Sequence, residues 1–273
     1  MKIADILSGT KKRKKRGLRV NRLKGSSLFN KKTKKKLLKK YVKEGGNVFP
    51  NTTDFPHEKI PDIMKTINSV LTKTNSTAIP IGSGATPTKG KVSGDLDMIV
   101  DVDQLKQHFN MEDAKDADIR KKLRQVFDLA GFNTGQSGTS VHVEVKSGDA
   151  THQVDVMVVP NAANAAQFHT HSIPAGSKFK GTNKHQLLSI IAREKGMLWS
   201  NYVGLFKRLP NGKKDPNGFI TSDINEIAKL LLGPNARKED MGSVEAIVAA
   251  LGTEGEQLLA NIRANDPNWK ELD

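Results

Sequence analysis

Cysteine is absent from the 273 residues of this sequence. Its absence excludes disulfide bonds, thiolate zinc sites and cysteine nucleophiles, and it leaves carboxylate and histidine chemistry. Long apolar runs are also missing, because no segment approaches the roughly 20 apolar residues that a membrane span needs. The basic start, MKIADILSGTKKRKK, lacks the apolar stretch of a signal peptide. We therefore expect a soluble, intracellular protein.

Acidic residues are scarce in the first 46 positions, which carry 18 Lys or Arg against only Asp5 and Glu44, a net charge of +16. The whole chain has a net charge of +15, so the remaining residues together carry −1. The first 30 residues have few apolar side chains, and we expect them to be disordered in isolation. A second basic run, Lys31–Glu44, has the pattern of a short helix that would end at Gly45-Gly46.

Clustered cations of this kind bind phosphate backbones without reading sequence, and their affinity falls steeply with salt. The sequence therefore predicts that residues 1–46 form a flexible nucleic-acid-binding arm, with a solubilising or localisation tail as the alternative. The residues assigned to this contact are Lys11, Lys12, Arg13, Lys14, Lys15, Arg16, Lys34, Lys35 and Lys36.

The rest of the chain has the pattern of a folded α+β protein, long enough for one large or two modest domains. Apolar residues at helical spacing predict helices that begin at Pro61 and cover Asp116–Ala130. Apolar and alternating runs predict strands at Ala78–Ile81, Ser140–Lys146 and Thr151–Val159. A turn at 147–149 would join the last two strands as a hairpin.

A short acidic motif follows the first of these strands. A small-residue turn, Gly82-Ser83-Gly84, precedes Asp95 and Asp97. Residues two positions apart on a strand share one face, so both carboxylates would project together. Such a pair repels itself unless a cation lies between, and Mg²⁺ prefers carboxylate, water and phosphate oxygens. We interpret the pair as part of a metal-phosphate site, with a solvated strand edge as the alternative.

A third acid, Asp155, lies inside a nearly continuous apolar strand. A carboxylate there is costly unless it is paired or binds a metal. If this strand pairs with the strand of Asp95 and Asp97, three carboxylates converge. They could then hold two divalent cations roughly 3.5–4 Å apart, as in phosphoryl-transfer sites. Asp101 and Asp103 lie further along the first strand, and we interpret them as solvated residues at its end.

These motifs resemble the nucleotidyltransferase superfamily and, within it, the family X DNA polymerases, the relatives of DNA polymerase beta. The shared pattern is a Gly-Ser turn, a short loop, Ser-Gly-Asp-apolar-Asp, and a later apolar-Asp-apolar strand that leads to proline. In this sequence the pattern is Gly82-Ser83, Ser93-Gly94-Asp95-Leu96-Asp97, and Val154-Asp155-Val156 leading to Val159-Pro160.

The resemblance continues beyond the third acid, so that it covers roughly residues 78–240. The family has an aromatic-x-Gly element, a helix that ends in glycine, a strand that contains Asn and Tyr, and a closing helix with a Pro-x-x-Arg segment. The corresponding residues are Phe179-Lys180-Gly181, a helix at 183–195, Gly196, Asn201-Tyr202, and Pro234 and Arg237 within Thr221–Asp240.

The resemblance implies an α+β architecture with a polymerase beta-like palm and a mixed sheet at residues 47–167. A small C-terminal nucleotide-binding subdomain would follow at 168–240. Residues 241–273 would form a helical extension without a family counterpart. The lyase domain that normally precedes the palm has no counterpart in the short basic arm.

The resemblance also implies an enzyme that transfers a nucleoside monophosphate from an NTP or dNTP to a DNA or RNA 3′-OH, with release of pyrophosphate. Two Mg²⁺ or Mn²⁺ ions would serve as cofactors. Asp95, Asp97 and Asp155 would be the catalytic, metal-binding acids, with Asp155 nearest the primer 3′-OH. The residues assigned to nucleotide binding are Gly82, Ser83 and Gly94, the loop lysines Lys89 and Lys91, and Phe179 and Gly181.

Several positions depart from the family pattern. Ala85 and Thr86 stand where arginines follow the turn, and Lys178 replaces an aromatic residue. Ser189 and Ile190 occupy the neighbourhood of a template-facing arginine. Two alternatives to a small DNA polymerase therefore stay open. One is a template-independent transferase that acts on RNA or tRNA 3′ ends, and the other is a non-catalytic nucleic-acid-binding protein on a transferase core.

Overall fold

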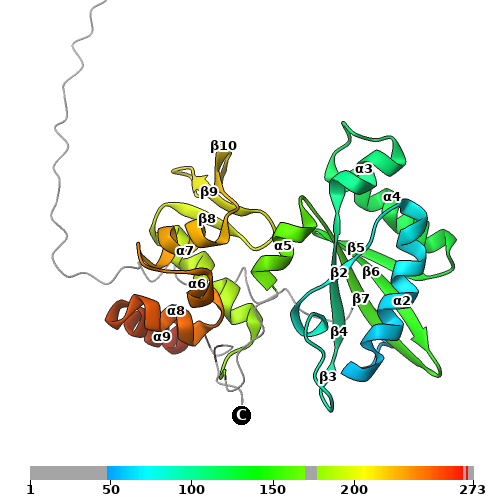
Figure 1. Ribbon diagram of the computed structural model, residues 1–273, viewed down its shortest axis with the longest axis horizontal. Coiled ribbons are helices and arrows are strands. Elements are labelled where there is room, and N and C mark those ends of the chain that lie inside the picture. The colour runs from blue at the N-terminus through cyan, green and yellow to red at the C-terminus, as the bar shows by residue number, and fades with distance from the viewer. Residues whose placement is uncertain (1–47, 170–176, 267–268, 270–273) are drawn as a thin grey trace, which may run out of the picture. The chain divides into compact units, whose positions relative to one another are not determined.

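The computed structural model describes residues 48–169, 177–266 and 269 (Figure 1). The predicted basic arm, including the helix expected at 31–44, lies outside these described residues. Within them, helices and strands form an α+β fold around a mixed sheet, as the sequence predicts. None of the helices in these ranges has the length and apolarity that a membrane crossing requires.

A mixed five-stranded sheet is built in the order β2-β4-β7-β6-β5. Only β4 and β7 are parallel, and the other neighbours are antiparallel. The strand bounds are β2 Ile79–Pro80, β4 Asp95–Asp101, β5 Asn133–Ser137, β6 Ser140–Ser147 and β7 Ala150–Val159. A separate antiparallel pair joins β1, Phe55–Pro56, to β3, Val92–Ser93.

Different helices cover the two faces of this sheet (Figure 1). The helices α2 (Ile60–Leu71), α3 (Val102–Phe109) and α4 (Asp116–Leu129) pack their apolar residues against one face. That face carries alternate strand residues such as Leu96 and Val154, which are fully buried. Each such side chain contributes about 1.5–3 kcal/mol through removal from water.

The opposite face packs against α5, Ala162–His169. Its contacts are with Ile99, Met157 and Val159, which follow the three acids along their strands. Because side chains alternate between faces, the acids at odd positions 95, 97 and 155 share the face of Ile99 and Met157. The acids therefore lie on this face, before the part that α5 packs against.

A second hydrophobic core is formed by a three-stranded antiparallel sheet, in the order β10-β9-β8, and four helices. The bounds are α6 Gly181–Glu194, β8 Met197–Ser200, β9 Gly204–Arg208, β10 Lys214–Thr221, α7 Ile224–Leu232, α8 Val244–Leu251 and α9 Thr253–Asn265. Ile247 of α8 and Ile262 of α9 pack in the same core as α6 and α7. The described residues also include the short 3₁₀ turns η2 His57–Lys59, η3 Thr72–Thr74, η4 Gly82–Gly84 and η5 Lys238–Met241.

Most elements that the sequence predicts are present, with ends displaced by a few residues. The helices α2 and α4 and the strands β6 and β7 match closely, whereas β2 is shorter than predicted. The helix α3 and the edge strand β5 were not predicted. Asn201-Tyr202 was expected inside a strand, and this is wrong, because β8 ends at Ser200 and both residues lie in the turn before β9.

Asp101 lies at the end of β4, as predicted, but it also has a role that the sequence did not predict. Asp101 is the N-cap of α3, and its Oδ1 accepts hydrogen bonds from the backbone N–H groups of Asp103 (2.9 Å) and Gln104 (3.3 Å). Its Oδ2 accepts a third from the N–H of Ala162, at the start of α5 (3.0 Å). Capping satisfies amide groups that a helix leaves without internal partners, so Asp101 has a structural role. Asp103 is exposed in the first turn of α3.

Candidate active site

The three predicted acids meet where β4 and β7 run side by side. In this parallel pair Asp97 lies directly opposite Asp155, and Asp95 is two residues earlier on the same face. One carboxylate oxygen from each residue can be chosen so that all three lie within 4.8 Å of one another. In the described ranges, this is the one cluster of His or acidic side chains that could hold a metal ion.

The cluster carries a high electrostatic cost. Burial, followed by the negative charges of Asp95 and Asp155, raises the pKa of Asp97 to about 7, and the nearby His142 opposes this rise. Burial and the charge of Asp155 also raise the pKa of Asp95. A hard divalent cation such as Mg²⁺ or Mn²⁺ would remove this repulsion, and carboxylate oxygens are its preferred ligands. The donor set therefore fits such an ion.

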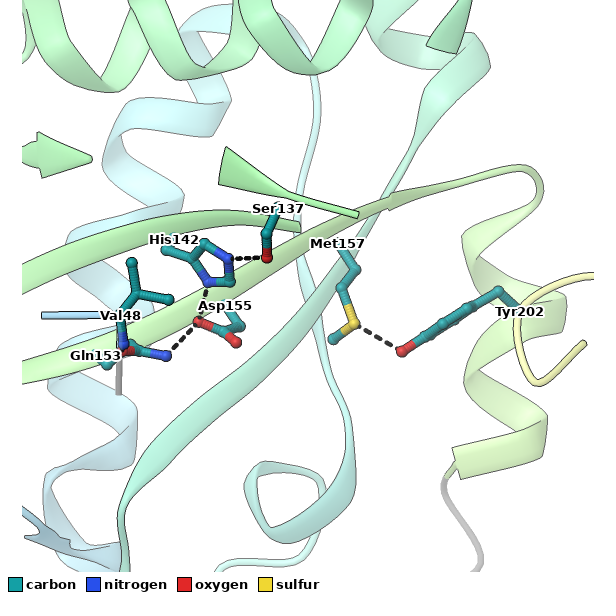
Figure 2. A network of polar contacts seen from close by, with 7 residues as sticks. All are labelled: Val48, Ser137, His142, Gln153, Asp155, Met157 and Tyr202. Carbon is teal, nitrogen blue, oxygen red and sulfur yellow. Dashed lines mark hydrogen bonds and ion pairs between the residues drawn. The ribbon is translucent and has the colours of Figure 1, made fainter. Parts of the chain in front are cut away.

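Asp155 is supported by polar partners from two neighbouring positions (Figure 2). His142, opposite Asp155 on the antiparallel strand β6, places Nδ1 2.8 Å from Asp155 Oδ1. Gln153, two residues earlier on β7, donates from Nε2 to the same oxygen at 2.9 Å. Behind them, Ser137 Oγ lies 2.7 Å from His142 Nε2, and the Val48 N–H donates to Gln153 Oε1 at 2.7 Å.

The Gly82–Gly84 turn lies beside the acids, and its glycines have geometric reasons to be glycine. Gly82 has a φ of +56°, and a Cβ added there would lie 3.8 Å from Asp97 Oδ2. A Cβ on Gly84 would lie only 2.5 Å from Leu96 Cδ1 in the core. The turn is therefore held tightly against β4, next to Asp97.

The Ser83 hydroxyl ends a directed chain of hydrogen bonds. The Thr88 N–H donates to His57 Nδ1 (2.9 Å), so Nε2 carries the ring proton of a neutral imidazole. Nε2 lies 2.8 Å from Ser93 Oγ, and the Ser93 hydroxyl donates to Ser83 Oγ at 2.9 Å. With its oxygen accepting from Ser93, Ser83 can use its own O–H to donate to a ligand.

The other loop residues assigned to nucleotide binding are exposed. Lys89 and Lys91 lie in the loop between η4 and β3, which is tied down by the Gly90 N–H donating to Glu58 Oε1 (2.8 Å). Gly94 is exposed directly before Asp95, and a Cβ there would lie 3.5 Å from Asp54 Oδ1. Asp54 is a fourth carboxylate near the group, and its charge contributes to the raised pKa of Asp95.

Phe179 and Gly181 belong to a different part of the fold. Phe179 is buried in the second core, with its ring centroid 6.0 Å from that of Trp269, and Gly181 is the first residue of α6. The first core and the sheet that carries the acids do not include them. Their assignment to nucleotide binding stays a prediction.

The roles of the residues that support the site were not predicted from the sequence; these residues are chiefly His142, Gln153, His57 and Ser93. His142 and Gln153 are 5% and 2% exposed, and a polar residue that is so deeply buried needs a partner. The sequence holds a signal for Gln153, because Gln153 and His152 are polar residues next to the apolar run of β7. Of the two, Gln153 contacts an acid and His152 does not. His152 instead packs against Phe55, with ring centroids 5.1 Å apart.

Together, the fold and the site define an α+β protein whose mixed sheet carries a carboxylate cluster suited to a divalent cation. No protein-family model matches the chain, and no curated protein matches it in sequence. It is similar to solved structures of Leishmania infantum polymerase beta. One, a ternary P/T complex, is 14% identical, has a TM-score of 0.44, and the match covers 76% of this chain and 87% of that chain. The other, a ternary gap complex, is also 14% identical and has a TM-score of 0.46, and the match covers 68% of this chain and 70% of that chain. At this identity and these TM-scores, the likeness assigns neither a family nor an activity.

Proposed function

We propose that this protein is a metal-dependent nucleotidyltransferase that adds nucleoside monophosphates from a (d)NTP to a polynucleotide 3′-OH and releases pyrophosphate, as a small polymerase beta-like DNA polymerase does. The observation that carries this proposal is the convergence of Asp95, Asp97 and Asp155 on one face of paired parallel strands. Three carboxylates so close together repel one another and destabilise the folded protein. A purely structural role does not require this, because neutral residues at the same positions would give a stable fold.

Asp95, Asp97 and Asp155 would hold Mg²⁺ or Mn²⁺. Such ions, when bound in a pair, favour ionisation of an attacking hydroxyl and neutralise charge on a triphosphate. The three carboxylates themselves place negative charge together on β4 and β7, where it can hold such ions. Asp155, whose Oδ1 is already occupied by His142 and Gln153, would face the 3′-OH and help to activate it.

The turn at Gly82-Ser83, next to Asp97, supports a phosphate-binding role. Gly82 lies beside Asp97, so the phosphates of a nucleotide held at the acids would lie close to this turn. The Ser83 O–H is available to donate to them because Ser93 already donates to Ser83 Oγ. Backbone N–H groups in a small-residue turn commonly bind phosphate in the same way.

The test is double substitution of Asp95→Ala and Asp97→Ala, with incorporation of labelled nucleotide as the measurement. We expect incorporation to fall to background while the protein remains folded by circular dichroism. The variant Asp103→Ala, at an exposed acid on α3, is the matched control and should retain activity. Unchanged incorporation in the double variant would reject the site assignment and favour a non-catalytic nucleic-acid-binding protein.

A template-independent transferase on RNA or tRNA ends is the second candidate, and one observation favours it. On α6, Ser189 donates back to the carbonyl of His185 (2.8 Å), and Ile190 packs against the second core. This turn of the helix presents no cation to a template at these two positions. A panel of gapped DNA, single-stranded DNA and tRNA, with dNTPs or NTPs and with Mg²⁺ or Mn²⁺, separates the candidates, because preference for tRNA would exclude gap filling.

A further inference from the structure

Both side-chain hydrogen bonds to Asp155 end on the same oxygen (Figure 2). Oδ1 accepts from Gln153 Nε2 at 2.9 Å and lies 2.8 Å from His142 Nδ1. Among the described residues, no hydrogen bond reaches Oδ2. One oxygen of this carboxylate is therefore occupied, and the other is available to a cation.

Each of the two donors is itself held in place. Gln153 Oε1 accepts from the Val48 N–H, and His142 Nε2 lies 2.7 Å from Ser137 Oγ. Because a carboxylate oxygen can only accept, His142 Nδ1–H is the donor to Asp155, and Nε2 is the ring nitrogen that faces the Ser137 hydroxyl. Both side chains are almost fully buried, so water does not compete for these bonds.

The other two acids lack this support. Among the described residues, neither Asp95 nor Asp97 accepts a hydrogen bond from a side chain, although both have nearby charges. Their carboxylates can therefore rotate towards a cation with one oxygen or with both. Asp155 differs because rotation of its carboxylate would break two buried hydrogen bonds to a charged group.

We propose that His142 and Gln153 restrict Asp155 to monodentate coordination through Oδ2, and that this restriction makes the site select Mg²⁺ or Mn²⁺ over Ca²⁺. Mg²⁺ takes six ligands in a near-octahedral arrangement at about 2.0–2.1 Å, which suits single oxygens at defined positions. Ca²⁺ takes six to eight oxygens at about 2.3–2.6 Å and gains from bidentate carboxylates. An acid that cannot turn its second oxygen towards the ion withholds one of these ligands from Ca²⁺. The inference rests on the metal site of the proposed function.

Three single substitutions test the role of His142, each made in the full chain. His142→Leu removes the donor at similar volume. His142→Asn keeps an N–H near the position of Nδ1, and Ser137→Ala leaves the bond from His142 to Asp155 in place. The dissociation constants of Mg²⁺, Mn²⁺ and Ca²⁺ are measured by calorimetry without nucleotide, so that the readout is independent of catalysis.

We expect His142→Leu to weaken Mg²⁺ binding by about 10–100-fold, the usual effect of losing a partner that orients a metal ligand. Ca²⁺ binding should weaken much less, so the preference for Mg²⁺ over Ca²⁺ should fall. His142→Asn should restore most of the preference, and Ser137→Ala should change it least. Equal weakening of both ions in folded His142→Leu, or no weakening, would overturn the proposal.

Gln153→Met is the second variant, for the case that His142→Leu does not fold. It removes the other donor to Oδ1 at similar volume and should lower the same preference, whereas an unchanged preference would count against the proposal. Failure of the proposed site gives a different result, because Asp95→Ala with Asp97→Ala would then bind Mg²⁺ as tightly as the wild type.

Discussion

Of the three acids, Asp97 is the one whose pKa is raised far enough to lie near neutral pH. Burial and the charges of Asp95 and Asp155 raise its pKa to about 7, so at higher pH the ion-free site holds a costly negative charge. A residue that destabilises the free protein and is relieved by a ligand is typical of functional sites. Removing the charge of Asp97 should therefore stabilise the metal-free protein and weaken metal binding.

We predict that Asp97→Asn stabilises the metal-free protein above pH 7, by about 1–3 kcal/mol, because it removes a buried charge. The variant should also lose the additional stability that Mg²⁺ gives the wild type. Urea unfolding with and without Mg²⁺ measures both effects. The exposed Asp103→Asn serves as control, and a destabilised Asp97→Asn protein would show that Asp97 has a structural role instead.

The hydrogen-bond chain that ends at Ser83 gives a second prediction at this scale. Ser93→Ala removes the donor to Ser83 Oγ, so Ser83 is less well oriented towards a phosphate. We expect KM for the nucleotide to rise several-fold, while Mg²⁺ binding in the absence of nucleotide stays as in the wild type. Steady-state kinetics and calorimetry separate the two, and a loss of metal binding instead would place Ser93 in the metal site.

Among the elements, α3 and α5 share one capping residue. Asp101 accepts from the N–H groups of Asp103 and Gln104 in α3 and from that of Ala162 in α5. We predict that Asp101→Ala lowers the free energy of unfolding by about 1–2 kcal/mol, the usual cost of losing an N-cap. Its Mg²⁺ affinity should change little compared with Asp97→Asn. A loss of metal binding as large as that of Asp97→Asn would contradict the structural assignment.

The helix α6 introduces a buried base into the second core. Lys184 is 5% exposed and donates from Nζ to the Phe168 carbonyl (3.2 Å), and burial lowers its pKa to about 8. Close to it, burial and the charge of Lys184 lower the pKa of His169 to about 4. In both cases the unfolded chain binds the proton more tightly than the folded chain.

Stability should therefore rise with pH in two windows, from about 4 to 6.5 for His169 and from about 8 to 10.5 for Lys184. Below each window the group is charged in both states, and the cost of burying that charge is then fully present. Lys184→Met should abolish the rise in the upper window. Urea unfolding followed by tryptophan fluorescence tests this, and an upper window that persists in the variant would contradict the assignment.

The hairpin of β6 and β7 shows why part of the site escaped sequence reasoning. The acids themselves were predictable, because their spacing and the apolar strand around Asp155 are local patterns. The role of His142 depends on register, and the predicted turn at 147–149 was one residue too long. In the structure Ser147 pairs with Ala150, so only Gly148 and Asp149 form the turn, and His142 falls opposite Asp155. A shift of one residue would have turned His142 to the other face.

At the scale of the whole molecule, long-range contacts were the least predictable. The bond from Val48 to Gln153 joins residues 105 apart in sequence, and no local pattern encodes it. The α+β class and the two acid-bearing strands follow from hydrophobic periodicity, which acts over a few residues. The packing of α8 and α9 into the second core depends instead on which apolar faces meet in space.

The predicted arm, residues 1–46, determines the net charge of the whole chain, because it carries +16 and the rest carries −1. We predict that removal of residues 1–46 weakens polynucleotide binding and flattens its salt dependence, because fewer phosphate contacts release counterions. Mg²⁺ affinity should be retained, since Val48 and its bond to Gln153 remain. A truncation that extends through Asn51 removes this bond as well and is the matched comparison. Equal affinity and salt slope after the first truncation would refute the role of the arm.

The tight turn between β6 and β7 also bears on the order of folding. His142 and Asp155 are only 13 residues apart, so the hairpin that unites them closes a short loop at small entropic cost. Asp95 and Asp97 join Asp155 only through the parallel pairing of β4 with β7, across the intervening helices and strands. Non-local pairings of this kind form slowly. Asp155 and His142 would then be in place early in folding, and the three-acid cluster would be completed late. An ion that binds only the completed cluster would therefore act mainly by slowing unfolding.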